Sequence, residues 1–197
     1  NNKYLLMVNE LYPIFLKVHA FDVLIVGGGE VGLEKISFLL KSSPNAKVTL
    51  VAKEIKNEIK VSVQNHPYVK LIEREFFNED LTEMQLVIIA TENQKLNKTI
   101  QAEAKERGIL VNVADTPELC DFYMGSIVTK GDLKIGISTN GKSPTIAKRL
   151  RELFTDLLPD EIDTLIGNME MVRNNMKGDF DYKVKELNKL TEHLISK

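Results

Sequence analysis

Short, continuous runs of apolar residues alternate with helical periodicity over the first 115 residues. The apolar runs are rich in Val, Ile and Leu, which is typical of parallel strands buried on both faces. They predict strands at Val23–Gly27, Lys47–Ala52, Val69–Glu73, Leu86–Thr91 and Ile109–Val113. Periodic patterns between them predict helices near Glu30–Lys41, Glu54–Asn65 and Gln94–Arg107. This alternation predicts an α/β fold with a Rossmann-type, doubly wound parallel sheet.

The pattern changes beyond residue 115. The segment GSIVTKGDLKIGIST predicts a β-hairpin with its turn at KGD. A helical pattern follows, with Ser143 as the expected N-cap and Pro144 at the first helical position. It is interrupted near residues 158–160 and 177–179. We therefore divide the chain into an α/β domain at residues 1–115, a hairpin region at 116–150 and a helical C-terminal domain at 151–197.

The composition is that of an ordinary globular protein. Of the 197 residues, 43% are hydrophobic and 27% are charged. The net charge of −2 gives no electrostatic reason to expect a nucleic acid partner, and no apolar run approaches the roughly 20 residues of a membrane span. The single cysteine, Cys120, excludes an internal disulfide and a cysteine-based zinc site, which favours a cytoplasmic location.

A glycine-rich loop lies where the first predicted strand meets the first helix. Gly27, Gly29 and Gly32 in VLIVGGGEVGLEK have the spacing G-x-G-x-x-G. In such loops the first glycine permits a tight turn, the second lets a pyrophosphate approach the backbone, and the third lets the helix pack closely on the sheet. The free N–H groups at the helix N-terminus favour an anion. The strand–loop–helix context predicts a dinucleotide site, the alternative being a glycine turn kept for packing alone.

Further cofactor contacts are expected at the ends of the second and fourth strands. Glu54 could accept a hydrogen bond from a ribose 2′-hydroxyl, which favours NAD, whereas Lys53 could meet the 2′-phosphate of NADP. We favour NAD, and the alternative is that both side chains are simply solvated. Thr91 lies at a strand's carboxyl end, where open α/β sheets bind ligands.

Candidate proton-transfer residues are carboxylates rather than histidines. His19, His66 and His193 have no metal-ligand spacing and lie away from the carboxyl ends of the strands, so we interpret them as surface residues. Cys120 has no evident adjacent base, and we interpret it as structural. Asp115 follows the fifth strand and Asp121 lies in the next loop; either could exchange a proton beside a nicotinamide or merely cap the local turn.

Several segments of the chain resemble one known family. They are YPIFLKV, VLIVGGGEVGLEK, VTLVAKE, LVIIATENQKLN, VNVADTPELCDFYM and ISTNGKSPTIAKRLRE, which occur in the family's order from residue 12 to about residue 155. The chain resembles the N-terminal module of siroheme synthase and the stand-alone precorrin-2 dehydrogenases. The resemblance implies NAD-dependent oxidation of precorrin-2 to sirohydrochlorin, which some members follow with Fe²⁺ insertion to form siroheme.

The resemblance also implies roles for individual residues. The family's functional aspartate lies in a segment that matches Asn112–Asp115, which makes Asp115 the expected general base. It implies a homodimer joined through the region after Asp115 and a helical tail that helps to cover the tetrapyrrole.

The basic residues Lys142, Lys148, Arg149 and Arg151 could meet substrate carboxylates or form a solvated helix face. The expected cofactor contacts are Gly27, Gly29, Glu30, Val31, Gly32, Lys53, Glu54, Thr91 and Asn112, and we predict no metal-binding residue.

Two other hypotheses remain open at this point. The chain could be a regulatory module that senses a dinucleotide and turns over no substrate. It could also be a chelatase without dehydrogenase activity, in which case metal insertion would not need NAD.

Overall fold

The computed structural model describes residues 9–192, which form two compact units. The first unit takes the described residues up to Gly125 together with Ser138–Ser143. The second takes Ser126–Ile137 and the described chain from Pro144 onward. The chain therefore leaves the first unit, forms a hairpin, and returns briefly before it continues into helices.

The first unit is built on a parallel sheet. Its strands are β1 (Asp22–Val26), β2 (Lys47–Ala52), β3 (Val69–Glu73), β4 (Leu86–Ile89) and β5 (Leu110–Val113). Their order is β3-β2-β1-β4-β5, so the direction of winding reverses between β1 and β4. In open α/β sheets such a reversal opens a crevice at the carboxyl ends of the strands, where ligands bind. The predicted Rossmann-type sheet is confirmed.

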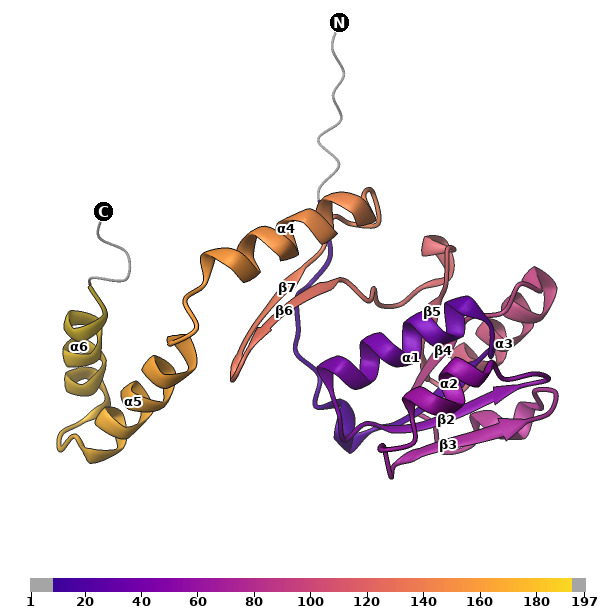
Figure 1. Ribbon diagram of the computed structural model, residues 1–197, viewed down its shortest axis with the longest axis horizontal. Helices are drawn as coiled ribbons and strands as arrows, with labels where there is room; N and C mark the ends of the chain where they lie inside the picture. Colours follow the sequence, from indigo (N-terminus) through magenta and orange to yellow (C-terminus); the bar gives the residue numbers. More distant parts are fainter. Residues whose placement is uncertain (1–8, 193–197) are drawn as a thin grey trace, which may run out of the picture. The chain divides into compact units, whose positions relative to one another are not determined.

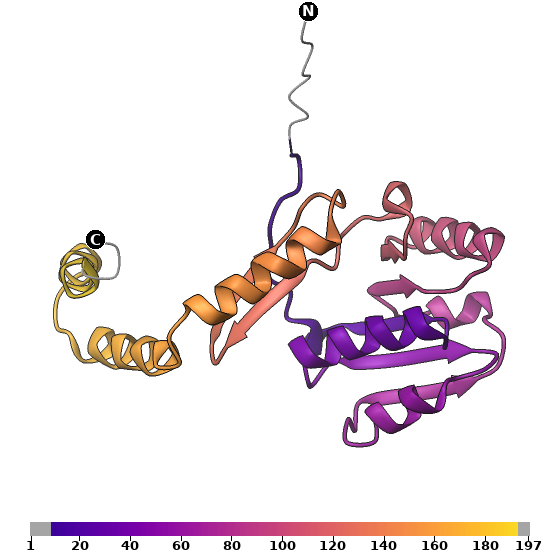
Figure 2. The ribbon, with the colours of Figure 1, turned by 45° about the horizontal axis from the view of Figure 1, so that its top comes forward.

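Helices cover both faces of this sheet, as Figures 1 and 2 show. The helices α1 (Glu30–Ser42) and α2 (Asn57–Ser62) pack on one face, and α3 (Gln94–Glu106) packs on the other. Successive residues of β1 alternate between the two cores: Ile25 joins the core under α1, and Leu24 joins the core under α3. Both are fully buried, which explains why β1 has no polar alternation.

The helix α2 is shorter than the sequence pattern predicts. The N–H of Ile55 donates to Glu73 Oε1 at 3.0 Å, and the N–H of Lys56 donates to the carbonyl of Gly28 at 3.0 Å. Because these tertiary hydrogen bonds hold the residues before Asn57 in place, the helix begins there rather than at Glu54. Three short 3₁₀ helices, Val18–Ala20, Asn78–Leu81 and Pro117–Leu119, were not expected from the pattern.

The second unit contains the predicted hairpin, followed by helices (Figure 1). The antiparallel strands are β6 (Ser126–Lys130) and β7 (Leu133–Ile137), followed by α4 (Pro144–Leu157), α5 (Ile162–Asn175) and α6 (Phe180–Thr191). The helix α4 packs on the hairpin and α6 packs on α5. Breaks in the helical pattern and the start at Pro144 agree with the sequence prediction.

The hairpin turn is attached to the start of α5. Gly131 has φ +54, and a Cβ atom there would lie 1.9 Å from Asp163 Oδ1. The same carboxylate oxygen accepts a hydrogen bond from the N–H of Asp132 at 2.7 Å. Lys130 Nζ lies 2.8 Å from Asp160 Oδ1. The positive φ of Gly131 and the closeness of Asp163 explain why glycine occupies the turn.

Candidate functional site

The glycine loop turns the chain sharply at the end of β1. Gly27 has φ +123, and a Cβ atom there would lie 2.3 Å from the carbonyl oxygen of Ala90. A Cβ atom at Gly32 would lie 2.1 Å from the carbonyl oxygen of Gly27, so the absence of side chains lets α1 approach the loop. At Gly29, no atom of the described residues lies within 4 Å of that position, apart from Gly29 itself and its chain neighbours. Gly29 therefore keeps space open at the surface, as expected if a phosphate approaches there.

The N-terminus of α1 faces this open space without a side-chain cap. Gly29 is the N-cap residue, and as a glycine it has no side chain that could accept a hydrogen bond from the first turn. The first N–H groups of a helix, here those of Glu30, Val31 and Gly32, have no carbonyl partner within the helix. Such groups and the positive end of the helix dipole suit a pyrophosphate, and this region fits a dinucleotide.

Gly28 ties the loop to the segment that follows β2. A Cβ atom at Gly28 would lie 2.3 Å from the carbonyl oxygen of Glu54 and 2.9 Å from Ala52 Cβ. The carbonyl of Gly28 also accepts the hydrogen bond from Lys56. The phosphate-type loop and the segment expected to meet the ribose are thus held together through backbone contacts.

The charged side chains after β2 differ in whether they form ion pairs. Lys53 Nζ lies 2.7 Å from Glu75 Oε1, and this contact raises the pKa of Lys53 above its usual value. Lys56 pairs with Glu30. Glu54 is exposed, and within residues 9–192 its carboxylate has no hydrogen-bond or ion-pair partner.

Thr91 follows β4 and is held by the start of α3. Asn97 is only 6% exposed, and its Nδ2 donates to the carbonyl of Thr91 at 2.9 Å. The hydroxyl of Thr91 donates to Asn97 Oδ1 and accepts from the N–H of Asn93 at 3.2 Å. The side chain of Asn93 in turn caps α3 by accepting from the N–H of Leu96. Thr91 therefore shapes the turn, and its backbone borders Gly27.

Asp115 lies just beyond β5 at the same edge of the sheet. The N–H of Ala90 donates to the carbonyl of Val26 at 2.8 Å, and that of Ala114 donates to Ile89 at 2.9 Å, which aligns the carboxyl ends of β1, β4 and β5. Asp115 is exposed and has φ +56, in the left-handed region that favours glycine. Residues in this conformation cluster at functional sites. In the described part of the chain, the carboxylate of Asp115 has no hydrogen-bond or ion-pair partner.

The loop after Asp115 returns along the open edge of β5. The N–H of Asp121 donates to the carbonyl of Val111 at 2.7 Å, and Asp121 Oδ2 accepts from the N–H of Val111 at 3.1 Å. Cys120 Sγ accepts from the N–H of Val113 and donates to its carbonyl, both at 3.2 Å. We call Cys120 and Asp121 together the β5 clamp. It closes the loop that carries Asp115.

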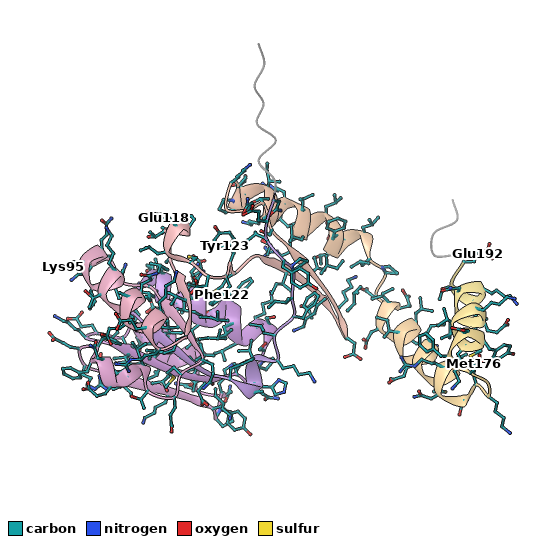
Figure 3. All side chains as sticks on the ribbon, turned by 180° about the vertical axis from the view of Figure 1, so that it is seen from behind. Lys95, Glu118, Phe122, Tyr123, Met176 and Glu192 are labelled. Carbon is teal, nitrogen blue, oxygen red and sulfur yellow. The ribbon has the colours of Figure 1, made fainter. Side chains whose placement is uncertain are left out.

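The β5 clamp has consequences for the candidates considered from the sequence. Asp121 is engaged by Val111 and by Lys105, whose Nζ lies 3.3 Å from Asp121 Oδ1. Burial raises the pKa of the Cys120 thiol, which does not favour a reactive thiolate. Asn112 is 7% exposed, and its Nδ2 donates to the carbonyl of Phe122 at 2.8 Å, in the loop labelled in Figure 3.

The remaining candidates lie apart from this edge. His19 is exposed in the first 3₁₀ helix, and the Nδ1 atom of His66 lies 3.2 Å from the carbonyl oxygen of Pro44; His193 lies outside the described residues. Among residues 9–192, no three His, Cys, Asp or Glu side chains are grouped as they would be around a metal ion. Within the same range, no helix has the length and apolar character needed to cross a membrane.

Sequence reasoning missed Gly28 and Asn97. It interpreted Cys120 as structural and Asp121 as a possible cap of the local turn, but it did not predict that both would bind β5. Gly28 occupies a variable position of the G-x-G-x-x-G spacing, and only the third consecutive glycine hinted at a steric need. Asn97 lies in a polar stretch, and no spacing in the sequence marks it as buried. These residues act through contacts across the fold, which local patterns do not record.

Two family models match parts of this chain. The model of a family described as "Putative NAD(P)-binding" matches residues 14–126, and one described as "Sirohaem biosynthesis protein central" matches residues 130–157. The chain is 36% identical to a siroheme synthase of Psychrobacter arcticus over 89% of this chain and 31% of that protein. It is 32% identical to a siroheme synthase of Nitrosomonas europaea over 87% of this chain and 36% of that protein. The chain thus spans about a third of the length of these relatives.

A solved structure shares the fold. The protein called SirC, precorrin-2 dehydrogenase, superposes with a TM-score of 0.74 at 22% sequence identity, over 91% of this chain and 89% of that one. The likeness extends over nearly the whole of both chains, so it includes the hairpin and helices as well as the parallel sheet.

Proposed function

This chain belongs to that NAD(P)-binding family and is homologous to part of the siroheme synthases, and from this premise we propose that it oxidises precorrin-2 to sirohydrochlorin with NAD⁺. The observation that carries the proposal is the position of Asp115. Its exposed carboxylate, which has no hydrogen-bond or ion-pair partner among residues 9–192, lies at the same sheet edge as the glycine loop. The winding of the sheet reverses beside that loop. A proton acceptor beside a dinucleotide is what this oxidation requires.

In the proposed reaction precorrin-2 loses a hydride and a proton. NAD⁺, held by the glycine loop and the first turn of α1, would supply the hydride acceptor. A carboxylate oxygen of Asp115 accepts the proton and later releases it to water, so the products are sirohydrochlorin, NADH and H⁺. The β5 clamp supports this role because it anchors both ends of the loop that carries Asp115. We expect general base catalysis of this kind to contribute about 10²- to 10⁴-fold to the rate.

The proposed cofactor contacts follow the glycine loop and the end of β2. The backbone of Gly29 and the first turn of α1, with Glu30, Val31 and Gly32, would hold the pyrophosphate. Glu54 would accept a hydrogen bond from the adenosine ribose, which favours NAD over NADP. The support for this choice is that the carboxylate of Glu54 is exposed and uncommitted in the described chain.

The acidic substrate suggests a use for the basic residues after the hairpin. We propose that Lys142, Lys148, Arg149 and Arg151 bind carboxylates of the tetrapyrrole, because guanidinium and ammonium groups recognise carboxylates strongly. Arg149 Nη1 lies 2.8 Å from Glu152 Oε2, so this pair would have to open for Arg149 to bind substrate. Our proposal also includes a homodimer and, as a second reaction, Fe²⁺ insertion into sirohydrochlorin.

An anaerobic assay tests the oxidation directly. Precorrin-2, purified protein and NAD⁺ are mixed, and sirohydrochlorin and NADH are followed by absorbance. We expect one NADH for each sirohydrochlorin. Asp115→Ala should turn over about 10²-fold more slowly or worse, because it lacks the carboxylate that accepts the proton. It should still bind NADH, because the glycine loop is unchanged. Glu118→Gln is a matched control, since it neutralises an exposed carboxylate in the same loop.

Other outcomes would point elsewhere. If folded protein binds NADH but oxidises no precorrin-2, the dinucleotide-sensing hypothesis gains support. If it inserts Fe²⁺ into sirohydrochlorin without any dinucleotide and oxidises nothing, the chelatase hypothesis does. Unchanged turnover by Asp115→Ala would refute the assignment of the base.

A further inference from the structure

The cations that follow β2 and β3 are matched by carboxylates, and this feature bears on the choice of dinucleotide. Lys53, the first residue after β2, pairs with Glu75, the second residue after β3. Their side chains are 73% and 63% exposed, so the pair lies at the surface where a ligand has access. The ammonium of Lys53 also holds the pKa of Glu75 below its usual value.

A second cation nearby is held more firmly. Arg74 Nη1 and Nη2 donate to the two carboxylate oxygens of Asp80 at 2.8 and 2.6 Å, and the guanidinium lies 5.1 Å from the centre of the Phe77 ring. Arg74 Nη1 also donates to the carbonyl of Glu75 at 2.7 Å. A bidentate pair with additional contacts has few donors left for another anion.

The third cation is Lys60, on α2. Its Nζ lies 3.0 Å from Glu73 Oε2, and Glu73 also accepts the N–H of Ile55 through Oε1. Glu73 is thus held by backbone as well as by Lys60. Lys53, Arg74 and Lys60 are thus all paired, and Lys56 pairs with Glu30. The carboxylate of Glu54, by contrast, has no hydrogen-bond or ion-pair partner within residues 9–192.

NADP differs from NAD by a phosphate on the 2′-oxygen of the adenosine ribose. That group carries about −1.5 to −2 charges near pH 7, by analogy with other phosphate monoesters, and it needs a free cation. At this site Lys53 is in the position to supply one, but the phosphate would have to displace Glu75 and then tolerate it as a neighbour of like charge.

We infer that Glu75 is a specificity-determining residue that disfavours NADP by keeping the ammonium of Lys53 paired. The inference rests on the proposed function, which places the adenosine ribose at the end of β2. It goes beyond the ribose contact of Glu54, because Glu75 belongs to the neighbouring strand connection and acts without touching the cofactor. NAD, which has a neutral hydroxyl at this position, needs no such cation.

The test compares binding of NADH and NADPH to the full chain, measured by the fluorescence of the reduced nicotinamide. In Glu75→Ala we expect the ratio of the NADPH to the NADH dissociation constant to fall about fivefold, the scale of one exposed ion pair. Glu79→Ala is the matched control: it removes an exposed carboxylate from the same strand connection but leaves Lys53 and Glu75 paired. Its ratio should match that of the wild type.

A double variant identifies the cause of any change. Lys53→Met combined with Glu75→Ala should abolish the gain in NADPH affinity, and the gain in the single variant should shrink as salt is added. An unchanged ratio in Glu75→Ala, an equal change in Glu79→Ala, or a gain that survives the loss of Lys53 would each overturn the inference. Wild-type protein that binds NADPH as tightly as NADH would do so too.

The same preparations separate this inference from the proposed function. Failure of the wild type to oxidise precorrin-2 with NAD⁺ would refute the proposed reaction. The ratio of the NADPH to the NADH dissociation constant could still be measured. Normal oxidation with an unchanged ratio in Glu75→Ala would refute only the role of Glu75.

Discussion

Alanine at two adjacent glycines of the loop should affect different properties: stability at Gly28 and NADH binding at Gly29. At Gly28 the new Cβ would lie 2.3 Å from the carbonyl oxygen of Glu54, 2.9 Å from Ala52 Cβ and 3.0 Å from Ile55 Cα. These are backbone atoms and a first side-chain atom, so no flexible group can swing away. The contacted segment must move by about 1 Å to reach ordinary van der Waals separation, and such overpacking costs about 1–3 kcal/mol.

The same movement would weaken the hydrogen bonds that hold the segment after β2. The N–H of Ile55 donates to Glu73 and that of Lys56 donates to Gly28, both at 3.0 Å. Each is worth about 1 kcal/mol net. We therefore expect Gly28→Ala to lower the free energy of unfolding by about 2–5 kcal/mol, which combines the overpacking and one or two weakened hydrogen bonds.

Gly29→Ala should leave the fold nearly unchanged. Apart from its chain neighbours, no residue in the described part of the chain has an atom within 4 Å of the new Cβ. The residue has φ −86, which alanine adopts. Because alanine is a poorer N-cap than glycine, we expect a loss below about 1 kcal/mol. The methyl group would instead occupy the space where a phosphate approaches, and losing one or two hydrogen bonds there should weaken NADH binding about tenfold or more.

The assay measures both properties on both variants. The chain has no tryptophan, so urea unfolding is followed by far-ultraviolet circular dichroism, and binding is followed by NADH fluorescence. The reasoning is refuted if Gly28→Ala unfolds at the wild-type urea concentration, or if Gly29→Ala binds NADH as the wild type does.

Two further changes test how the loops around the site are held. Asp80→Asn should destabilise by about 1–2 kcal/mol because it disrupts the bidentate contact with Arg74. The contact with Arg74 lowers the folded-state pKa of Asp80. The stabilisation is therefore present above the unfolded-state pKa and is lost as the pH falls through the lower folded-state pKa. Urea unfolding at pH 7 and near pH 3 should show the difference between variant and wild type shrinking; a constant difference would contradict this cause. Cys120→Ala should lower the free energy of unfolding by about 1–3 kcal/mol because it leaves the N–H of Val113 without its thiol partner. Cys120→Ser should retain part of the contact and lose less. Equal stability of the wild type and both variants would show that the thiol does not hold the β5 edge.

The sequence predicted the sheet well because its signal is local. The apolar run at Val23–Val26 and the glycines after it identify a buried strand followed by a phosphate-type turn, and the structure has β1 and a left-handed-region Gly27 there. The hairpin and the helix start at Pro144 were predicted equally well. Element ends were less predictable: Asn57, rather than Glu54, begins α2 because tertiary hydrogen bonds hold the residues before it.

The candidate site divides in the same way. The position of Asp115 after a strand was visible in the sequence. The sequence did not show which of the two side chains, Asp115 or Asp121, is held by other residues. The structure engages Asp121 with Val111 and Lys105 and leaves the carboxylate of Asp115 uncommitted within the described chain. Two aspartates six residues apart look equivalent in a linear pattern, since the pattern does not record which edge of a strand each one meets.

The sequence by itself determined the α/β class, the glycine loop at the end of β1 and the candidate carboxylate at the end of β5. Hydrophobic periodicity and the backbone freedom of glycine depend on residues near one another in the chain, so they can be read from it. Only the tertiary structure decided that Gly28 must lack a side chain, that Glu75 neutralises Lys53, and that the β5 clamp anchors the loop of Asp115. These depend on parallel strands bringing together distant residues, and the contacts exist only once the sheet has formed.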